Sequence, residues 1–151
     1  MDWCHYRFRS IWELAAAPAD VYAVLENAEE YPRWWPQVRE VTPVDDRTGT
    51  ARFRSFLPYD LVVTAQERRR DPDTRTLEIG MTGDLEGWVR WTVRPARLGA
   101  VHGTRAFYEQ VVDVHKPLLR HVAVPGRPVF LANHAWMMRS GRRGLAAALA
   151  R

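Results

Sequence analysis

Several features that mark common metalloenzyme, nucleotide-binding and membrane-protein classes are missing from this 151-residue chain. Cys4 is its only cysteine, which excludes an intrachain disulfide and a thiolate metal cluster. No stretch approaches the ~20 uncharged apolar residues of a membrane-spanning helix. The sequence also contains no HExxH motif, no glycine-rich phosphate loop and no Gly-x-Ser-x-Gly elbow. It therefore predicts no metal, no cofactor and no membrane insertion.

Lysine is almost absent, because Lys116 is the only lysine among 22 basic residues, and the formal net charge is +4. The longest basic run, Arg68-Arg69-Arg70, is followed at once by Asp71 and Asp73. A nucleic-acid surface would instead be basic along one face, with aromatic side chains interleaved for stacking. The charge pattern therefore predicts no nucleic-acid partner.

The first residues, Met1 to Arg7, include an early acid and no apolar run before a small-residue cleavage site, so we expect no secretory signal. A free thiol suits a reducing compartment, which places the protein in the cytoplasm. The chain shows no internal repeat, low-complexity tract or Gly/Ser linker. Residues 1–151 are therefore expected to form a single domain.

A strand and a helix are predicted at the beginning of the chain. Aromatic and β-branched residues dominate positions 3–14, which is typical of a long strand. Ala17-Pro18-Ala19-Asp20 then favours a helix start, since proline fits the first turn and an acid is favourable there. Apolar residues recur at helical spacing from Val21 to Ala28. The helix is predicted to end before Tyr31-Pro32, because a proline disfavours helical geometry in the preceding residue.

Six extended runs separated by turn sequences follow between about residues 37 and 115. The predicted strands are 38–44, 51–56, 59–70, 75–81, 85–94 and 101–114. Their short connections favour an antiparallel meander. Alternation in the last two strands predicts one inward face; its members are Leu85, Gly87, Val89, Trp91 and Val93 on the first and Ala106, Tyr108, Gln110, Val112 and Val114 on the second.

A long helix is predicted from about Val129 to the end of the chain, roughly 33 Å at 1.5 Å per residue. One stripe of apolar or small positions is expected to face the sheet: Leu131, His134, Met138, Gly141, Leu145 and Leu149. Gly141 and Gly144 each cost about 1 kcal/mol in a helix, which indicates either a close approach of the backbone to the sheet or fraying. The fold class is thus α+β, with a seven-stranded curved antiparallel sheet, short helices after the first strand and a long C-terminal helix.

The sequence resembles the SRPBCC superfamily of START and Bet v 1-like helix-grip proteins, specifically its bacterial polyketide cyclase/dehydrase-like branch. The matching segments are Ala17 to Tyr22, Trp34-Trp35-Pro36, Leu57-Pro58-Tyr59, Gly83 to Gly87 with Trp91, Gly103-Thr104, and Asn133-His134 with Met138 and Gly141. The resemblance implies a helix-grip fold that binds lipids, sterols, polyketides or other apolar compounds, with cyclisation or dehydration in some members. The chain departs from the family pattern at Ala106, usually larger, and at Gln110, often aromatic.

A small apolar or aromatic ligand is expected in a cavity between the sheet and the last helix, because one helix cannot fill the concave face of so long a sheet. The residues predicted to bind it are Trp35, Tyr59, Leu61, Val63, Ile79, Met81, Val89, Trp91, Tyr108, Gln110, Asn133, His134, Met137 and Met138. Trp35 and Trp91 have core packing as the alternative role. Trp34 is expected in the core.

His134 and Tyr108 are the candidate catalytic residues. A buried histidine that titrates near neutrality acts as a general acid or base, whereas the alternative is a neutral imidazole that donates to a backbone carbonyl. Gln110 would orient a ligand carbonyl.

Three functions remain open at this point. They are a carrier or sensor of a hydrophobic molecule, a polyketide cyclase or dehydratase that uses these polar groups, and an interaction domain whose interior is filled. The oligomeric state also stays open, with a homodimer as one alternative.

Overall fold

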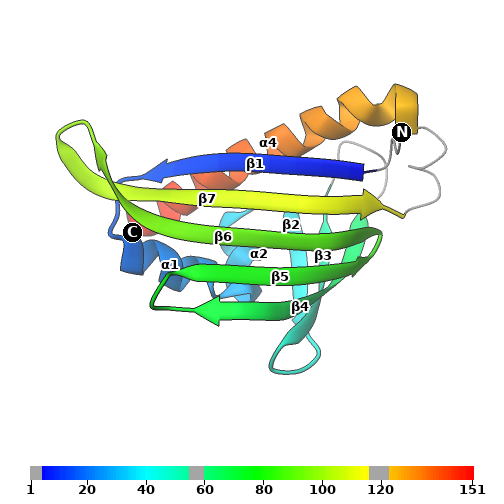
Figure 1. Cartoon of the computed structure of the whole chain (residues 1–151), viewed down its shortest axis with the longest axis horizontal. Helices are drawn as coiled ribbons and strands as arrows, with labels where there is room; N and C mark the ends of the chain where they lie inside the picture. Colours follow the sequence, from blue (N-terminus) through cyan, green and yellow to red (C-terminus); the bar gives the residue numbers. More distant parts are fainter. Residues whose placement is uncertain (1–4, 55–59, 116–122) are drawn as a thin grey trace.

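Seven antiparallel strands form one curved sheet in the computed structural model, which describes residues 5–54, 60–115 and 123–151 (Figure 1). The strands are β1 (His5–Leu14), β2 (Val38–Pro43), β3 (Thr48–Phe53), β4 (Leu61–Asp71), β5 (Thr76–Gly83), β6 (Leu85–Leu98) and β7 (Val101–Val114). Their order in the sheet is β1-β7-β6-β5-β4-β3-β2, so the N-terminal strand is brought beside the last one. Strands β2 to β7 form the predicted meander, and β1 is added at its edge beside β7.

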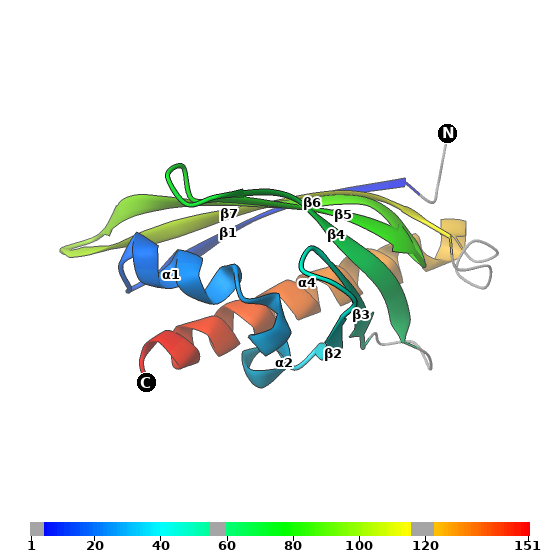
Figure 2. The same cartoon turned by 90° about the horizontal axis from the view of Figure 1, so that it is seen from below.

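The helices lie together on one face of the sheet, the concave one (Figure 2). They are α1 (Pro18–Leu25), the 3-10 turn η1 (Ala28–Glu30), α2 (Tyr31–Trp34) and α4 (Ala123–Leu149). α4 runs beneath the sheet, α2 packs against α4, and α1 packs against β6 and β7 (Figure 2). The α+β helix-grip fold predicted from the sequence is confirmed.

Alternation along β6 and β7 gives the sheet its dry face. Trp91 pairs with Tyr108 and Val93 with Ala106 across the two strands, and all four side chains are buried. Their neighbours Arg94, Arg105 and Glu109 point the other way, because successive side chains of a strand alternate between faces. The predicted inward faces of the last two strands are therefore confirmed.

One predicted helix boundary is confirmed and one is wrong. The first helix ends before Tyr31-Pro32 as predicted, since α1 ends at Leu25, although these two residues then open the separate short helix α2. Pro32 sits in the first turn of α2, where its missing N–H is not needed. α4 begins at Ala123 rather than near Val129 and carries Pro128 inside it. A proline costs a helix about 3 kcal/mol, which a helix of 27 residues with a packed face tolerates.

Leu131 does not lie in the stripe that faces the sheet, contrary to the prediction. Its side chain is 41% exposed, and Phe130 takes that position, 4.5 Å from the ring of Tyr6. Spacings of three and four residues before His134 both fit a helical face, so the sequence does not distinguish Leu131 from Phe130. The remainder of the stripe is as predicted, with Met138, Gly141 and Leu145 buried.

The two glycines of α4 mark a close approach rather than fraying. A Cβ on Gly144 would overlap the carbonyl oxygen of Trp34, and one on Gly141 would lie 2.5 Å from the ring of Trp35. The nearest neighbours are thus Trp34 at the end of α2 and Trp35 directly after it, not the sheet as expected, although Trp12 of β1 also lies 2.8 Å from the Gly141 position. Only glycine lets α4 reach this depth.

Replacing Gly144 with alanine is therefore expected to destabilise the protein. Alanine favours a helix by about 1 kcal/mol, but the clash with the Trp34 backbone should reverse that gain and give a net loss of about 1–3 kcal/mol. Urea denaturation of Gly144→Ala measures the change, with the exposed neighbour Arg143→Ala as the control. A Gly144→Ala protein as stable as the wild type would show that α4 does not need this contact.

Candidate functional site

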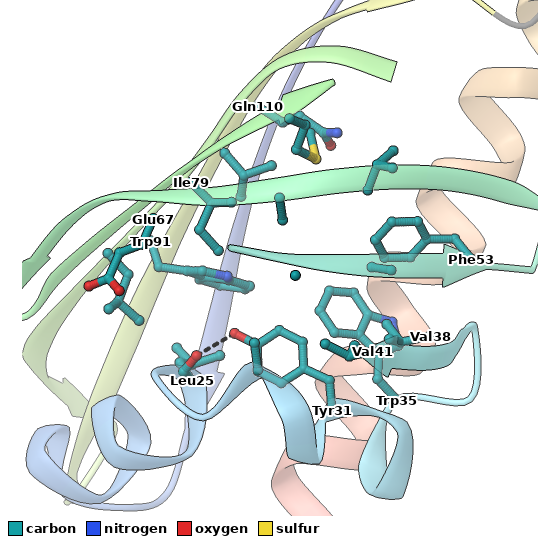
Figure 3. A pocket seen from close by; sticks show the side chains of 18 of the residues that line it. Leu25, Tyr31, Trp35, Val38, Val41, Phe53, Glu67, Ile79, Trp91 and Gln110 are labelled. Carbon is teal, nitrogen blue, oxygen red and sulfur yellow. Dashed lines mark hydrogen bonds between the residues drawn. The ribbon is translucent and has the colours of Figure 1, made fainter. Parts of the chain in front are cut away.

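A cavity of about 550 Å³ lies between the concave face of the sheet and α4 (Figure 3). Most of the residues predicted from the sequence line it: Trp35, Leu61, Val63, Ile79, Met81, Val89, Trp91, Tyr108, Gln110, Asn133, His134 and Met137. Met138 does not; it is buried in the core with Trp12 and Trp35. Tyr59 lies outside the described residues. The interior is thus hollow, which is contrary to the filled-interior alternative.

Sequence reasoning missed more lining residues than it found. The missed residues include charged side chains near the mouth, among them Glu67 and Arg70, and an apolar group from the strands and helices around the cavity: Phe8, Leu25, Tyr31, Val38, Val41, Ala51, Phe53, Ala65, Leu77, Leu85, Val112 and Phe130. Period-two alternation identifies Leu85 and Val112, which share a face with Trp91 and Gln110. Tyr31 comes from a helical turn that the sequence did not predict, so its position could not be inferred.

Tryptophans make one wall of the cavity rigid. Trp35 lines the cavity, and its Nε1–H donates to the backbone oxygen of Met137 at 2.9 Å, which ties α2 to α4. Trp91 lines it as well and packs against Trp12 and Tyr108, with ring centroids 4.7 and 4.8 Å away. Trp35 and Trp91 therefore combine core packing with cavity lining, and Trp34 belongs to the core as expected.

A polar cluster of Tyr108, Gln110 and His134 forms one pole of this apolar space. The hydroxyl of Tyr108 donates to Gln110 Oε1 at 2.6 Å, and His134 Nε2 lies 3.0 Å from the same oxygen. Because an amide oxygen only accepts, His134 must carry its proton on Nε2. The predicted backbone carbonyl partner of His134 is thus replaced by a side-chain oxygen from β7.

Burial keeps the cluster uncharged. Desolvation lowers the pKa of His134 to about 4, and its ring stacks on Phe8 with centroids 3.6 Å apart. Burial likewise raises the pKa of the Tyr108 phenol, with a smaller contribution from Tyr31. At neutral pH both groups are therefore neutral, and neither exchanges a proton readily.

The amide of Gln110 presents a donor to the cavity. Its oxygen already accepts two hydrogen bonds, whereas its N–H groups have no partner among the described residues. The Nδ1 atom of His134 likewise has no partner within the described ranges and is an acceptor. The polar pole thus offers one donor group and one acceptor to a bound molecule.

Charged residues surround the mouth of the cavity, and a β-bulge places two of them. Glu67 pairs with Ile79 and Arg70 with Leu77, so the register shift between Glu67 and Arg69 brings both side chains to the concave face. Residues three apart in a regular strand would point to opposite faces. The bulge therefore builds an ion pair, Arg70 Nε to Glu67 Oε1 at 2.9 Å, at the rim.

The same rim holds the C-terminal end of α1. Arg70 Nη2 donates to the backbone oxygen of Glu26 at 3.5 Å, and the Tyr31 hydroxyl donates to the backbone oxygen of Leu25 (Figure 3). Both side chains satisfy carbonyl groups that the last helical turn leaves without partners. Burial raises the pKa of Tyr31, which keeps its phenol protonated as a donor.

In the part of the chain that the structure describes, no three His, Cys, Asp or Glu side chains gather closely enough to hold a metal ion. None of the described helices combines the length and the apolar character of a membrane span. The chemistry of the site therefore rests on an apolar wall, one neutral polar pole and a charged mouth.

Comparison with known proteins agrees with this geometry. The model of the family described as "Polyketide cyclase / dehydrase and lipid transport" matches residues 14–135. None of the curated proteins compared with the sequence matches it significantly.

Solved structures share the fold at low sequence identity. The protein TTHA0849 from Thermus thermophilus superposes with a TM-score of 0.73 at 15% identity, covering 95% of this chain and 99% of that one. A START superfamily protein from Mycobacterium smegmatis gives 0.72 at 15% identity, with 95% and 97% covered. The Zhui aromatase/cyclase from Streptomyces sp. R1128 gives 0.69 at 14% identity, with 97% and 94% covered. Identities this low support the fold alone.

Stability should fall in mild acid because of His134. The unfolded chain binds a proton near pH 6.5 and the folded protein only near 4, so lowering the pH through this window favours unfolding. At pH 5 the loss attributable to His134 is about 2 kcal/mol. In His134→Gln, which keeps a donor toward Gln110, the difference in unfolding free energy between pH 7 and 5 should shrink by that amount. Equal pH dependence in both proteins would contradict the burial of a neutral imidazole.

Proposed function

Since the chain belongs to the polyketide cyclase/dehydrase and lipid transport family, we propose that it binds a small, largely apolar molecule with a carbonyl or hydroxyl group in the cavity under α4. The observation that carries the proposal is a hollow of about 550 Å³ whose inner wall is mainly hydrophobic and aromatic, with one neutral polar pole and a charged mouth. Cavities of this size and composition are typical of small-molecule sites.

The polar pole gives the ligand an orientation. A ligand carbonyl would accept from the free N–H groups of Gln110, and a ligand hydroxyl would also donate to His134 Nδ1. Since Tyr108 and His134 hold the Gln110 oxygen, the amide cannot rotate without losing two hydrogen bonds. The Gln110 amide is therefore held in one orientation before the ligand binds, which reduces the conformational entropy lost on binding.

The pKa values of His134 and Tyr108 favour ligand binding over proton-transfer catalysis. A general acid or base works best when its pKa lies near the working pH. The pKa of His134 is lowered to about 4 and that of Tyr108 is raised, so each lies far from neutrality. The cluster is thus better suited to hydrogen bonding than to moving protons, and we assign carriage or sensing of the ligand as the function.

A bulky side chain in the cavity should abolish ligand binding. Ala65 lines the cavity from β4, whereas the adjacent Thr64 is exposed and lies outside its lining. We expect Ala65→Trp to weaken binding of N-phenyl-1-naphthylamine, a neutral fluorescent aromatic probe, by at least about tenfold, or ~1.4 kcal/mol. Thr64→Trp, which places a tryptophan on the opposite face, should bind like the wild type. Equal loss or equal retention in both variants would argue against this cavity as the binding site.

The amide of Gln110 should confer a preference for ligands with a carbonyl group. We expect the wild type to bind 1-acetylnaphthalene more tightly than 1-ethylnaphthalene, because only the former accepts a hydrogen bond. Gln110→Met keeps the length of the side chain but removes the amide, and should lose this preference, about five- to tenfold, while still binding N-phenyl-1-naphthylamine. Competition titrations against that probe measure the ratio. A preference unchanged by the substitution would assign carbonyl recognition to another group.

A further inference from the structure

The two edges of the sheet are built differently. β2, at one edge, has six residues, a register shift between Val38 and Glu40 and a final proline, Pro43, all of which discourage another strand from pairing with it. β1, at the other edge, has ten residues in unbroken register with β7. A long regular edge is a template for strand addition.

α4 contacts β1 from the concave side, and no strand of the described residues pairs with the other edge of β1. Phe130 and His134 pack on Tyr6 and Phe8, which point into the molecule. At the start of the strand, Arg127 donates to the backbone oxygen of His5 at 3.2 Å. Figure 1 shows β1 at the margin of the sheet, with the first half of α4 running past this margin, and Figure 2 shows α4 on the concave side.

Backbone groups of the odd-numbered residues of β1 face this edge. The carbonyl oxygen of Leu14 lies 2.6 Å from the place of a Cβ on Gly103 of β7, so it points toward β7. Backbone groups alternate in direction along a strand, which turns those of Arg9, Ile11 and Glu13 outward. The His5 oxygen, bonded to Arg127 instead of β7, agrees with that alternation.

The sequence of this edge is complementary to itself. Ile11 is 57% exposed, the second most exposed large apolar side chain among the described residues. Arg9 and Glu13, of opposite charge, stand two residues before and after it on the same convex face. If a second β1 paired antiparallel about Ile11, each Ile11 would face its own copy and each Arg9 would face the other chain's Glu13.

Charges across the convex face continue this pattern. Arg90 bonds Glu78 at 2.7 Å and lies 3.9 Å from Glu109, which is paired in register with Arg9. This row of alternating charges ends at the open edge on Arg9. In the next row, Glu13 bonds Arg105 at 3.2 Å. Pairing about Ile11 would join the two rows, with Arg9 of one chain between Glu109 of its own chain and Glu13 of the other.

We propose that a second copy of this chain docks on the open edge of β1, antiparallel and centred on Ile11, so that one sheet runs through both copies. The mouth of the cavity, at β3, β4 and the end of α1, lies away from this edge and stays accessible. Exposed ion pairs contribute little alone, so the backbone hydrogen bonds and Ile11 carry the association and the charges set its register.

Cysteine cross-linking tests the position of the twofold axis. Directly opposed residues in a hydrogen-bonded antiparallel pair have Cα atoms about 5.5 Å apart, within disulfide range. In a Cys4→Ser background, Ile11→Cys should oxidise to a covalent dimer of twice 17.5 kDa at least tenfold faster than Val62→Cys, whose parent side chain is also exposed. Equal oxidation rates in the two proteins would overturn the proposal.

Charge exchange tests the register without a new covalent bond. Arg9→Glu and Glu13→Arg should each give monomers in sedimentation equilibrium at concentrations where the wild type dimerises, because like charges then oppose each other. The double variant, and an equimolar mixture of the two single variants, should dimerise again. Circular dichroism checks that each single variant is folded. A monomeric wild type, or single variants that dimerise as it does, would refute the pairing.

Discussion

The approach of α4 to Trp34 and Trp35 is the constraint on which the rest of the structure depends. Gly141 and Gly144 let the C-terminal half of the helix press against these two residues, and the bond from Trp35 to Met137 fixes the contact. In the N-terminal half of the helix, Phe130 packs on Tyr6 and His134 packs on Phe8. A straight helix held at both ends over a curved sheet spans the middle without filling it, which is why a cavity remains there.

The cavity also explains why the Tyr108 hydroxyl and His134 Nε2 are both hydrogen-bonded to the oxygen of Gln110. A buried hydroxyl or imidazole without a partner costs about 1–3 kcal/mol, and the hydrogen bonds from Tyr108 and His134 to Gln110 avoid that cost. The same burial that demands these bonds shifts both pKa values away from neutrality. Desolvation is thus the common reason why the buried polar groups are hydrogen-bonded and why their pKa values do not suit proton transfer. The Gln110 N–H groups, as donors, and His134 Nδ1, as an acceptor, remain available to a ligand.

Alternation and composition were enough to predict the sheet, the inward face of β6 and β7, and most of the named cavity residues, because a period of two fixes the face of every strand residue once one is known. Prediction failed where the spacing was ambiguous or the backbone irregular. Phe130 and Leu131 fit the same helical stripe, and the one-turn helix at Tyr31 has no periodicity to detect. The ion pair of Glu67 and Arg70 depends on a bulge, which changes the face of every residue after it and leaves no hydrophobic pattern among charged residues.

The two ends of the sheet differ in the regularity of their backbone. Near β3 and β4 the backbone is irregular, the bulge turns charged side chains inward, and the rim of the cavity holds the last turn of α1. At β1 the strand is regular and its inward side is anchored by aromatic contacts with α4. A rigid, open edge loses little conformational entropy when another strand is added, whereas an irregular one would have to be ordered first. The proposed strand pairing at β1 and the proposed ligand entry at the opposite end therefore use different parts of the fold.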